Sequence, residues 1–234
     1  MTLTTQQAIW AVVPAAGVGR RMDTDVPKQY LDLGGRCVLE HSLGRLLAHP
    51  EVSGAVVAVA TGDPYFEKLA FTGHVERVVG GEQRADSVLN ALEHLCSRGR
   101  ADDWALVHDA VRPCVHASDL DRLIAHVRSH SCGALLAVPV RDTMKRVEAG
   151  YVSATVSRED LWHALTPQLF PVHALRAALL DARVSGIVVT DEAQAMERVG
   201  QPPAVVRGRV DNIKITRPND LEMAALFLQQ VEHA

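Results

Sequence analysis

The chain has 234 residues, and its 47% hydrophobic and 22% charged residues are ordinary values for a globular protein. A net charge of −4 and 4% aromatic residues argue against a nucleic-acid-binding protein, which needs a basic surface or rings for base stacking. We find neither an apolar run long enough to cross a bilayer nor a secretion-signal pattern, so we expect no membrane partner. The cysteines at 37, 96, 114 and 132 form no Cys-x-x-Cys pair, which predicts reduced thiols in a cytoplasmic protein.

Short apolar segments alternate with helical patterns along most of the chain. Strands are predicted at 9–13, 54–60, 75–79, 104–107, 134–138, 204–210 and 213–216, with a brief extended piece at 30–33. Helices are predicted at 38–48, 65–69, 84–96, 118–130, 172–184, 191–199 and 218–231, with Ser118 and Thr190 as N-terminal caps of two of them. This alternation indicates an α/β fold, with a mostly parallel sheet covered by helices on both faces.

Residues 143–156 interrupt the alternation. Two short runs with strand-like alternation flank Glu148-Ala149-Gly150, which predicts a β-hairpin. A lone hairpin is marginally stable in water, so it folds back on its own domain or reaches a neighbouring subunit, and we favour the second. We find no repeat or linker, and therefore expect one domain over 1–234 with an arm at about 141–160.

The first predicted strand runs into a segment rich in small residues and cations. Small residues let the backbone approach a ligand closely, and consecutive N–H groups in such a turn bind anions. Arg20, Arg21 and Lys28 then supply positive charge, so the segment predicts a polyphosphate site. It is not a Walker loop, and Met22 replaces the third small residue of a dinucleotide fingerprint. The small residues are Pro14, Ala15, Ala16, Gly17 and Gly19.

The carboxyl ends of later strands carry further polar residues, at the edge where an open α/β sheet binds ligands. The turn after residue 79 can admit a base or a ribose, although a plain loop before a helix would look similar. Asp109 is placed to hold Mg²⁺ or another divalent cation, the alternative being a surface turn, and Arg112 to hold a second phosphate. Lys214 is flanked by apolar residues, which is unusual for a solvated cation, and Asp211 can steer it or join the metal shell.

The glycine-rich segment resembles the Gly-x-Gly-x-Arg…Pro-Lys signature of nucleotidyltransferases with a Rossmann-like domain. The closer resemblance, which extends over nearly the whole chain, is to the 2-C-methyl-D-erythritol 4-phosphate cytidylyltransferase family, through the blocks at 80–87, 108–113 and 208–216. Val111 departs from the usual His-Asp-Ala-Ala-Arg-Pro pattern, which affects only local pocket shape. The resemblance implies transfer of a cytidylyl group from CTP to methylerythritol phosphate, with release of pyrophosphate, by a homodimer joined through its arms.

The resemblance also implies roles for individual residues. Arg21, Lys28 and Lys214 would be catalytic, by neutralising the phosphates. The nucleotide would contact Pro14, Ala15, Ala16, Gly17, Gly19, Gly81, Ser87, Asp109 and Ala110. Methylerythritol phosphate would contact Arg112, Thr143, Arg158, Thr166 and Thr190, partly across the dimer. The divalent cation would involve Asp109, indirectly, and Asp211.

Two other functions remain open at this stage. A sugar-1-phosphate nucleotidyltransferase shares the loop but usually has a longer chain with an appended domain. A non-catalytic nucleotide-binding module would keep the glycine turns without needing Arg21, Lys28, Arg112 and Lys214 together. No convincing catalytic triad or carboxylate pair is present, and phosphate attack needs none, because a phosphate monoester is already ionised near neutrality.

Overall fold

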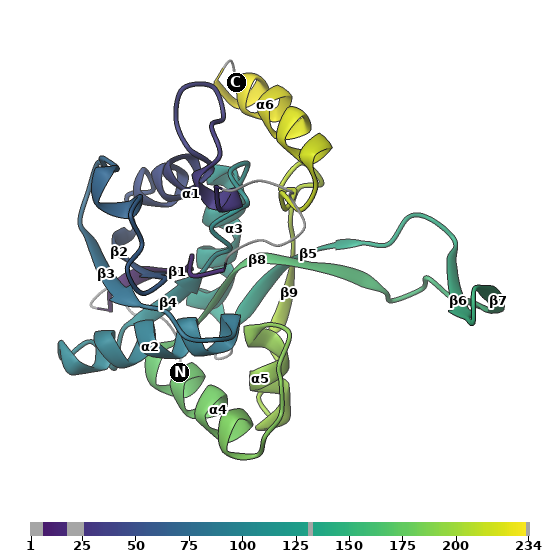
Figure 1. The fold of residues 1–234 in the computed structure, drawn as a ribbon. Helices are drawn as coiled ribbons and strands as arrows, with labels where there is room; N and C mark the ends of the chain where they lie inside the picture. The colour runs from purple at the N-terminus through teal and green to yellow at the C-terminus, as the bar shows by residue number, and fades with distance from the viewer. Residues whose placement is uncertain (1–6, 18–25, 131–132, 233–234) are drawn as a thin grey trace.

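The computed structural model describes residues 7–17, 26–130 and 133–232 (Figure 1). A seven-stranded sheet has the order β3-β2-β1-β4-β8-β5-β9. Its strands β1, β2, β3 and β4 are mutually parallel, β5 is parallel to β9, and β8 runs antiparallel between β4 and β5. The strands are β1 (Ile9–Pro14), β2 (Val52–Val59), β3 (Val75–Val79), β4 (Trp104–Val107), β5 (Ala134–Pro139), β8 (Trp162–Pro171) and β9 (Ala204–Arg207).

Helices cover both faces of the sheet, as predicted. Val12 and Val13 are adjacent in β1 and fully buried, yet they belong to different core clusters, because successive side chains of a strand point to opposite faces. Val13 packs with side chains of α1 and α3, and Val12 with those of α2 and α4. The helices are α1 (Val38–Leu47), α2 (Arg84–Ser97), α3 (Ala117–Ser129), α4 (Val172–Val184), α5 (Glu192–Arg198) and α6 (Pro218–Glu232), with 3-10 turns η1 (Lys28–Tyr30) and η2 (Phe66–Lys68).

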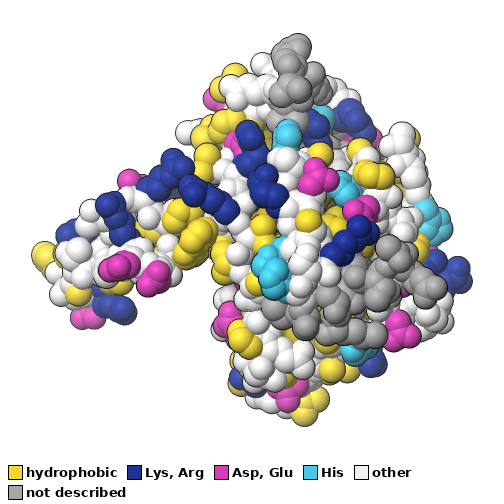
Figure 2. Space-filling view, turned by 180° about the vertical axis from the view of Figure 1, so that it is seen from behind, with side chains coloured by type: hydrophobic (Ala, Val, Ile, Leu, Met, Phe, Trp, Pro, Cys, Tyr) yellow, Lys and Arg dark blue, Asp and Glu magenta, His cyan; other side chains and the backbone are white. Residues whose placement is uncertain are grey.

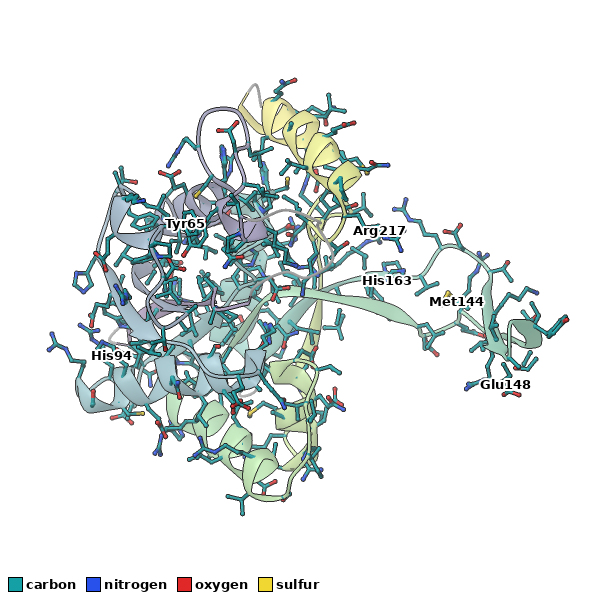
Figure 3. The ribbon with its side chains drawn as sticks, in the orientation of Figure 1. Tyr65, His94, Met144, Glu148, His163 and Arg217 are labelled. Carbon is teal, nitrogen blue, oxygen red and sulfur yellow. The ribbon has the colours of Figure 1, made fainter. Side chains whose placement is uncertain are left out.

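The predicted arm is a separate two-stranded sheet, formed by β6 (Met144–Glu148) and β7 (Tyr151–Val156). It projects away from the body, and Figure 3 shows Met144 and Glu148 far out on it. Ala149 and Gly150 make its turn with φ of 50° and 87°. Nearly all of its residues are exposed, among them Tyr151 at 81%. The hairpin therefore presents apolar side chains to its surroundings.

The chain departs from the predicted elements in a few places. Residues 162–171 form the central strand β8, which we did not predict, because Pro167 and the polar Gln168 are unusual in the middle of a sheet. Residues 213–216 form no strand, and of the extended piece predicted at 30–33, Tyr30 belongs to η1 and Asp32 forms only an isolated bridge with Cys37. Helices α3 and α5 begin one residue after His116 and Asp191, whose side chains accept the capping hydrogen bonds. No described helix has the length and apolar character needed to span a membrane.

Candidate active site

A cavity of about 170 Å³ opens at the carboxyl ends of β1, β3 and β4. Residues 14–17, at the end of β1, and residues 81–84, at the start of α2, line it. Asp109, Ala110 and Val111 after β4 also line it, as do Lys28 and Lys214. The structure therefore brings together in one pocket the cations Lys28, Arg84 and Lys214, which are far apart in the sequence.

Close packing holds the two walls against each other. The N–H of Ala15 donates to the carbonyl of Ala58 in β2 at 2.7 Å, which extends the sheet into the loop. A side chain at Gly80 would place its Cβ 2.4 Å from Cβ of Ala16, so only glycine fits there. The glycine in this turn thus permits the approach of two loops, rather than an unusual backbone angle.

Gly81 and Ser87 line the cavity, but their contacts with each other are internal. The N–H of Gly81 donates to Oγ of Ser87 at 3.1 Å, and the hydroxyl of Ser87 lies 3.2 Å from the carbonyl of Gln83. A Cβ at Gly81 would lie 2.2 Å from Cβ of Asp86. These contacts fix the conformation of the 80–87 turn, so the hydroxyl of Ser87 helps to shape the pocket.

Asp109 is the electrostatic centre of the site and is only 6% exposed. Its Oδ1 lies 2.9 Å from Nε of Arg84, and its Oδ2 lies 2.9 Å from Nζ of Lys214 and 3.3 Å from Nε of Arg112. Burial acts to raise the pKa of Asp109, but the charges of Arg84, Lys214 and Arg112 outweigh it and hold that pKa well below its usual value. Asp109 is therefore a fixed negative charge that positions three cations.

Glu192 and Arg84 form a second ion pair beside Asp109. The carboxylate of Glu192 is 1% exposed and accepts from both terminal nitrogens of Arg84, at 2.6 and 3.1 Å. Burial acts to lower the pKa of Arg84, but Glu192 and Asp109 raise it, so the guanidinium stays charged. The sequence predicted no role for either residue, although Arg84 lies in the 80–87 block. An acidic residue in the first turn of a helix is common, because it interacts favourably with the helix dipole, so Glu192 carried no signal of its own.

A second pocket adjoins the first and shares Arg84, Asp109 and Lys214 with it. Its other lining residues come from β8 and from the start of α5, among them Thr166 and Thr190. Arg112 lines it as well, so three of the five residues predicted for methylerythritol phosphate meet here. The remaining lining residues are Ala164, Leu165, Gln168 and Asp191. Two ligands in these pockets would meet at a boundary formed by an acidic residue and two cations.

A chain of buried hydrogen bonds connects His108, Thr166 and Asp109, and the donor and acceptor of each bond can be assigned. His108 is buried, and its Nε2 lies 2.9 Å from the carbonyl of Arg112, so Nε2 carries the proton and Nδ1 accepts from the Thr166 hydroxyl at 3.0 Å. The Thr166 oxygen in turn accepts from the N–H of Asp109 at 3.1 Å. Burial lowers the pKa of His108 to about 4. Thr166 therefore supports Asp109, in addition to lining the second pocket.

Arg112 and Val111 have internal contacts that the sequence did not reveal. Arg112 donates from Nη1 to the carbonyl of Asn212 at 2.7 Å, in addition to its contact with Asp109. Part of its guanidinium is thus already used, which limits the bidentate phosphate contact predicted for it. Val111 is 5% exposed and packs with Val38 and Ile215, so the methyl groups that distinguish this chain fill an apolar cluster.

Other predicted site residues lie elsewhere or outside the described residues. Asp211 pairs with Arg209 and lines a different pocket, so its predicted steering of Lys214 is wrong, and Asp109 has that contact instead. Thr143 and Arg158 are exposed at the arm and line neither site pocket of this protomer. Figure 2 shows Lys and Arg side chains gathered where the arm leaves the body. Gly19, Arg20 and Arg21 lie in 18–25, outside the described residues.

The chain is similar over almost its whole length to proteins of known name. The model of the family 2-C-methyl-D-erythritol 4-phosphate cytidylyltransferase matches residues 9–230. The enzyme of that name from Vibrio atlanticus is 53% identical over 229 residues, which cover 97% of this chain and 98% of the relative. A crystal structure of 4-diphosphocytidyl-2C-methyl-D-erythritol synthase superposes with a TM-score of 0.84 at 38% identity, covering 95% and 100% of the two chains. The Francisella tularensis cytidylyltransferase gives 0.82 at 36% identity, covering 94% and 100%.

Proposed function

Because this chain belongs to the 2-C-methyl-D-erythritol 4-phosphate cytidylyltransferase family, we propose that it transfers the cytidylyl group of CTP to 2-C-methyl-D-erythritol 4-phosphate. Pyrophosphate is the other product, and the reaction belongs to non-mevalonate isoprenoid precursor synthesis. The observation that carries this proposal is the pair of adjoining pockets with a shared boundary of Arg84, Asp109 and Lys214. The loop side takes the triphosphate, and the β8 side takes the acceptor phosphate.

Catalysis in this arrangement rests on positioning and charge. The acceptor phosphate attacks the α-phosphorus of CTP in line with the bond to the leaving pyrophosphate, and needs no base because it is already ionised. Lys28 and Lys214 both line the pocket and neutralise the charge that develops on the α-phosphate. We assign Arg21 the same task from the sequence pattern. The backbone N–H groups of Ala16 and Gly17, which line the pocket, hold other phosphate oxygens.

The donors at the site fit a magnesium ion held mainly by nucleotide phosphates. The described residues contain no group of three or more His, Cys, Asp or Glu side chains able to hold a metal by themselves. Both oxygens of Asp109 contact cations, which leaves it an indirect role through water. Mg²⁺ prefers phosphate oxygens and water, and when bound it would neutralise the triphosphate. We assign no metal contact to Asp211.

We also propose that two copies of the single domain associate through their arms. The arm exposes apolar residues to its surroundings, including Val147 at 57%, Tyr151 at 81% and Val152 at 61%. An isolated hairpin is weakly stable, and a second copy of the chain supplies the surface that it lacks. Thr143 and Arg158 would then reach the acceptor pocket of the partner. The free thiols of Cys37 and Cys114 support a cytoplasmic location.

The proposal is tested by following pyrophosphate release from CTP and methylerythritol phosphate with magnesium present. We expect turnover that needs both substrates and stops when EDTA removes the metal. Parallel reactions use ATP, GTP or UTP in place of CTP, and sugar 1-phosphates in place of the acceptor. Faster product formation with a sugar 1-phosphate would assign the chain to the sugar nucleotidyltransferases. CTP binding without turnover of any acceptor would indicate a binding module.

A further inference from the structure

Gln29 forms hydrogen bonds with the loop after β1, and the proposed mechanism gives it no role. It lies in η1, next to Lys28, and is only 4% exposed. Its Nε2 lies 2.7 Å from the carbonyl oxygen of Ala15 and 3.1 Å from that of Gly17. A carbonyl oxygen only accepts, so both contacts require the NH₂ group, and the opposite amide orientation would place oxygen against two oxygens.

These two hydrogen bonds set the direction of the loop backbone. The carbonyls of Ala15 and Gly17 point toward Gln29, while the residues themselves line the nucleotide pocket. A polyphosphate repels carbonyl oxygens and is bound by N–H groups, so engaging the carbonyls elsewhere prepares the loop for an anion. Gln29 also connects the chain before 18–25 with the chain after it, because Gly17 precedes that segment and Gln29 follows it.

We propose that Gln29 is a positioning residue, which fixes the carbonyls of Ala15 and Gly17 so that the loop can bind the CTP triphosphate. It links the loop to η1, so the same contacts hold Lys28 in register with the loop. Gln29 also lines the pocket, but its amide donors are used by the carbonyls of Ala15 and Gly17, so its role is to orient groups that touch the nucleotide. This inference rests on the proposed function for the identity of the ligand, but the loop geometry stands without it.

The decisive variant is Gln29→Met, which keeps the length of the side chain and removes both donors. Its control is Tyr30→Phe, in the same 3-10 turn, which removes the 2.8 Å hydrogen bond to Asp63 and no contact with the loop. We expect the Kd for CTP with Mg²⁺, measured by calorimetry, to rise at least tenfold in Gln29→Met and less than twofold in Tyr30→Phe. In steady state the KM for CTP should rise at least tenfold in Gln29→Met, with the KM for methylerythritol phosphate within twofold.

A readout without nucleotide separates this inference from the assigned reaction. The N–H of Ala15 is bonded to Ala58, and we expect its hydrogen exchange in Gln29→Met to accelerate at least tenfold, with Tyr30→Phe unchanged. Wild-type exchange and wild-type CTP affinity in a folded Gln29→Met protein would overturn the proposal. If Gln29→Met does not fold, Gln29→Glu is the second variant, because it keeps the shape of the side chain and replaces the NH₂ donor by a carboxylate oxygen. Wild-type CTP affinity in Gln29→Glu would also overturn the proposal. Failure of the wild type to bind CTP would instead refute the assigned substrate, and the exchange result would still stand.

Discussion

The Nζ atom of Lys214 lies 2.9 Å from Oδ2 of Asp109, at the boundary between the two adjoining pockets of the site. Lys214 follows β9 by several residues and has no regular secondary structure around it, so this contact helps to define its position. Arg84 and Arg112 share the same carboxylate. Asp109 therefore holds the lysine where the phosphates of two substrates would meet.

Replacing Lys214 should impair catalysis while leaving the fold intact. Its side chain is 38% exposed, and Lys214→Met leaves Asp109 paired with two arginines, so we expect little loss of stability. Loss of one preorganised cation at the reacting phosphate should lower kcat roughly 10²- to 10³-fold. Pyrophosphate release measures the change, with Lys68→Met on η2 as a control outside both pockets. Turnover within threefold of wild type would remove Lys214 from the mechanism.

Lys28 lines the same pocket as Lys214, so we expect its replacement to impair catalysis in the same way. Its Nζ lies 3.3 Å from the carbonyl of Ile215, near the lysine at 214. We expect Lys28→Ala to lower turnover by about two orders of magnitude or more, with an unchanged circular dichroism spectrum. Lys28→Arg, which keeps the charge and changes its shape, should retain more activity than the alanine variant. Equal rates for wild type and Lys28→Ala would contradict the proposed charge stabilisation.

Replacing Glu192 measures how much its ion pair with Arg84 contributes to stability and activity. Glu192→Gln leaves the half-buried Arg84 without its closest counter-charge, which should cost about 3 kcal/mol of unfolding free energy. The rate should fall as well, because Arg84 contacts Asp109 at the boundary of the two pockets. Urea denaturation measures the loss of stability. Glu67→Gln, which removes an exposed pair with Arg77, is the matched control and should change the free energy by less than about 1 kcal/mol.

His108 should make stability depend on pH below neutrality. Burial lowers its pKa from 6.5 to about 4, so between these values the unfolded chain binds a proton that the folded protein does not. Stability therefore decreases as pH falls through this window, by up to roughly 3 kcal/mol from this residue. His108→Asn lacks this effect, so the difference in unfolding free energy between wild type and variant should shrink from pH 7 to pH 4.5. A difference that stays constant would show that folding does not change the pKa of His108.

The proposed role of the arm in dimer formation can be tested by measuring self-association of the chain. Val152 is 61% exposed in β7, and Val152→Lys should weaken the proposed dimer without affecting the core. Sedimentation should show a wild-type dimer, a shift of Val152→Lys toward monomer, and a higher KM for methylerythritol phosphate in that variant. Val184→Lys, at an 86% exposed position at the end of α4, is the control and should remain a dimer. A monomeric wild type with full activity would refute the assembly.

Local patterns in the sequence determined much of this protein. The runs at 9–13 and 54–60 are apolar throughout, because a parallel strand buried on both faces needs apolar side chains at every position. The segment from Pro14 to Lys28 identified the pocket, since small residues followed by cations serve few purposes besides binding phosphate. The hairpin at 143–156 was equally visible, because alternation around a glycine turn is a property of neighbouring residues.

Tertiary structure decided what depends on contacts between distant residues. Strand β8 owes its place to pairing with β4 and β5 on either side, which overrides the local preferences of Pro167 and Gln168. Lys214 pairs with Asp109 and not with Asp211, which is only three residues away in the sequence. The chain after β9 brings Lys214 to the end of β4, where Asp109 lies, and Asp211 pairs with Arg209. Gln29 and Glu192 are ordinary polar residues in the sequence. They gain their roles only by burial beside groups that require a donor or a counter-charge, and no local pattern encodes that requirement.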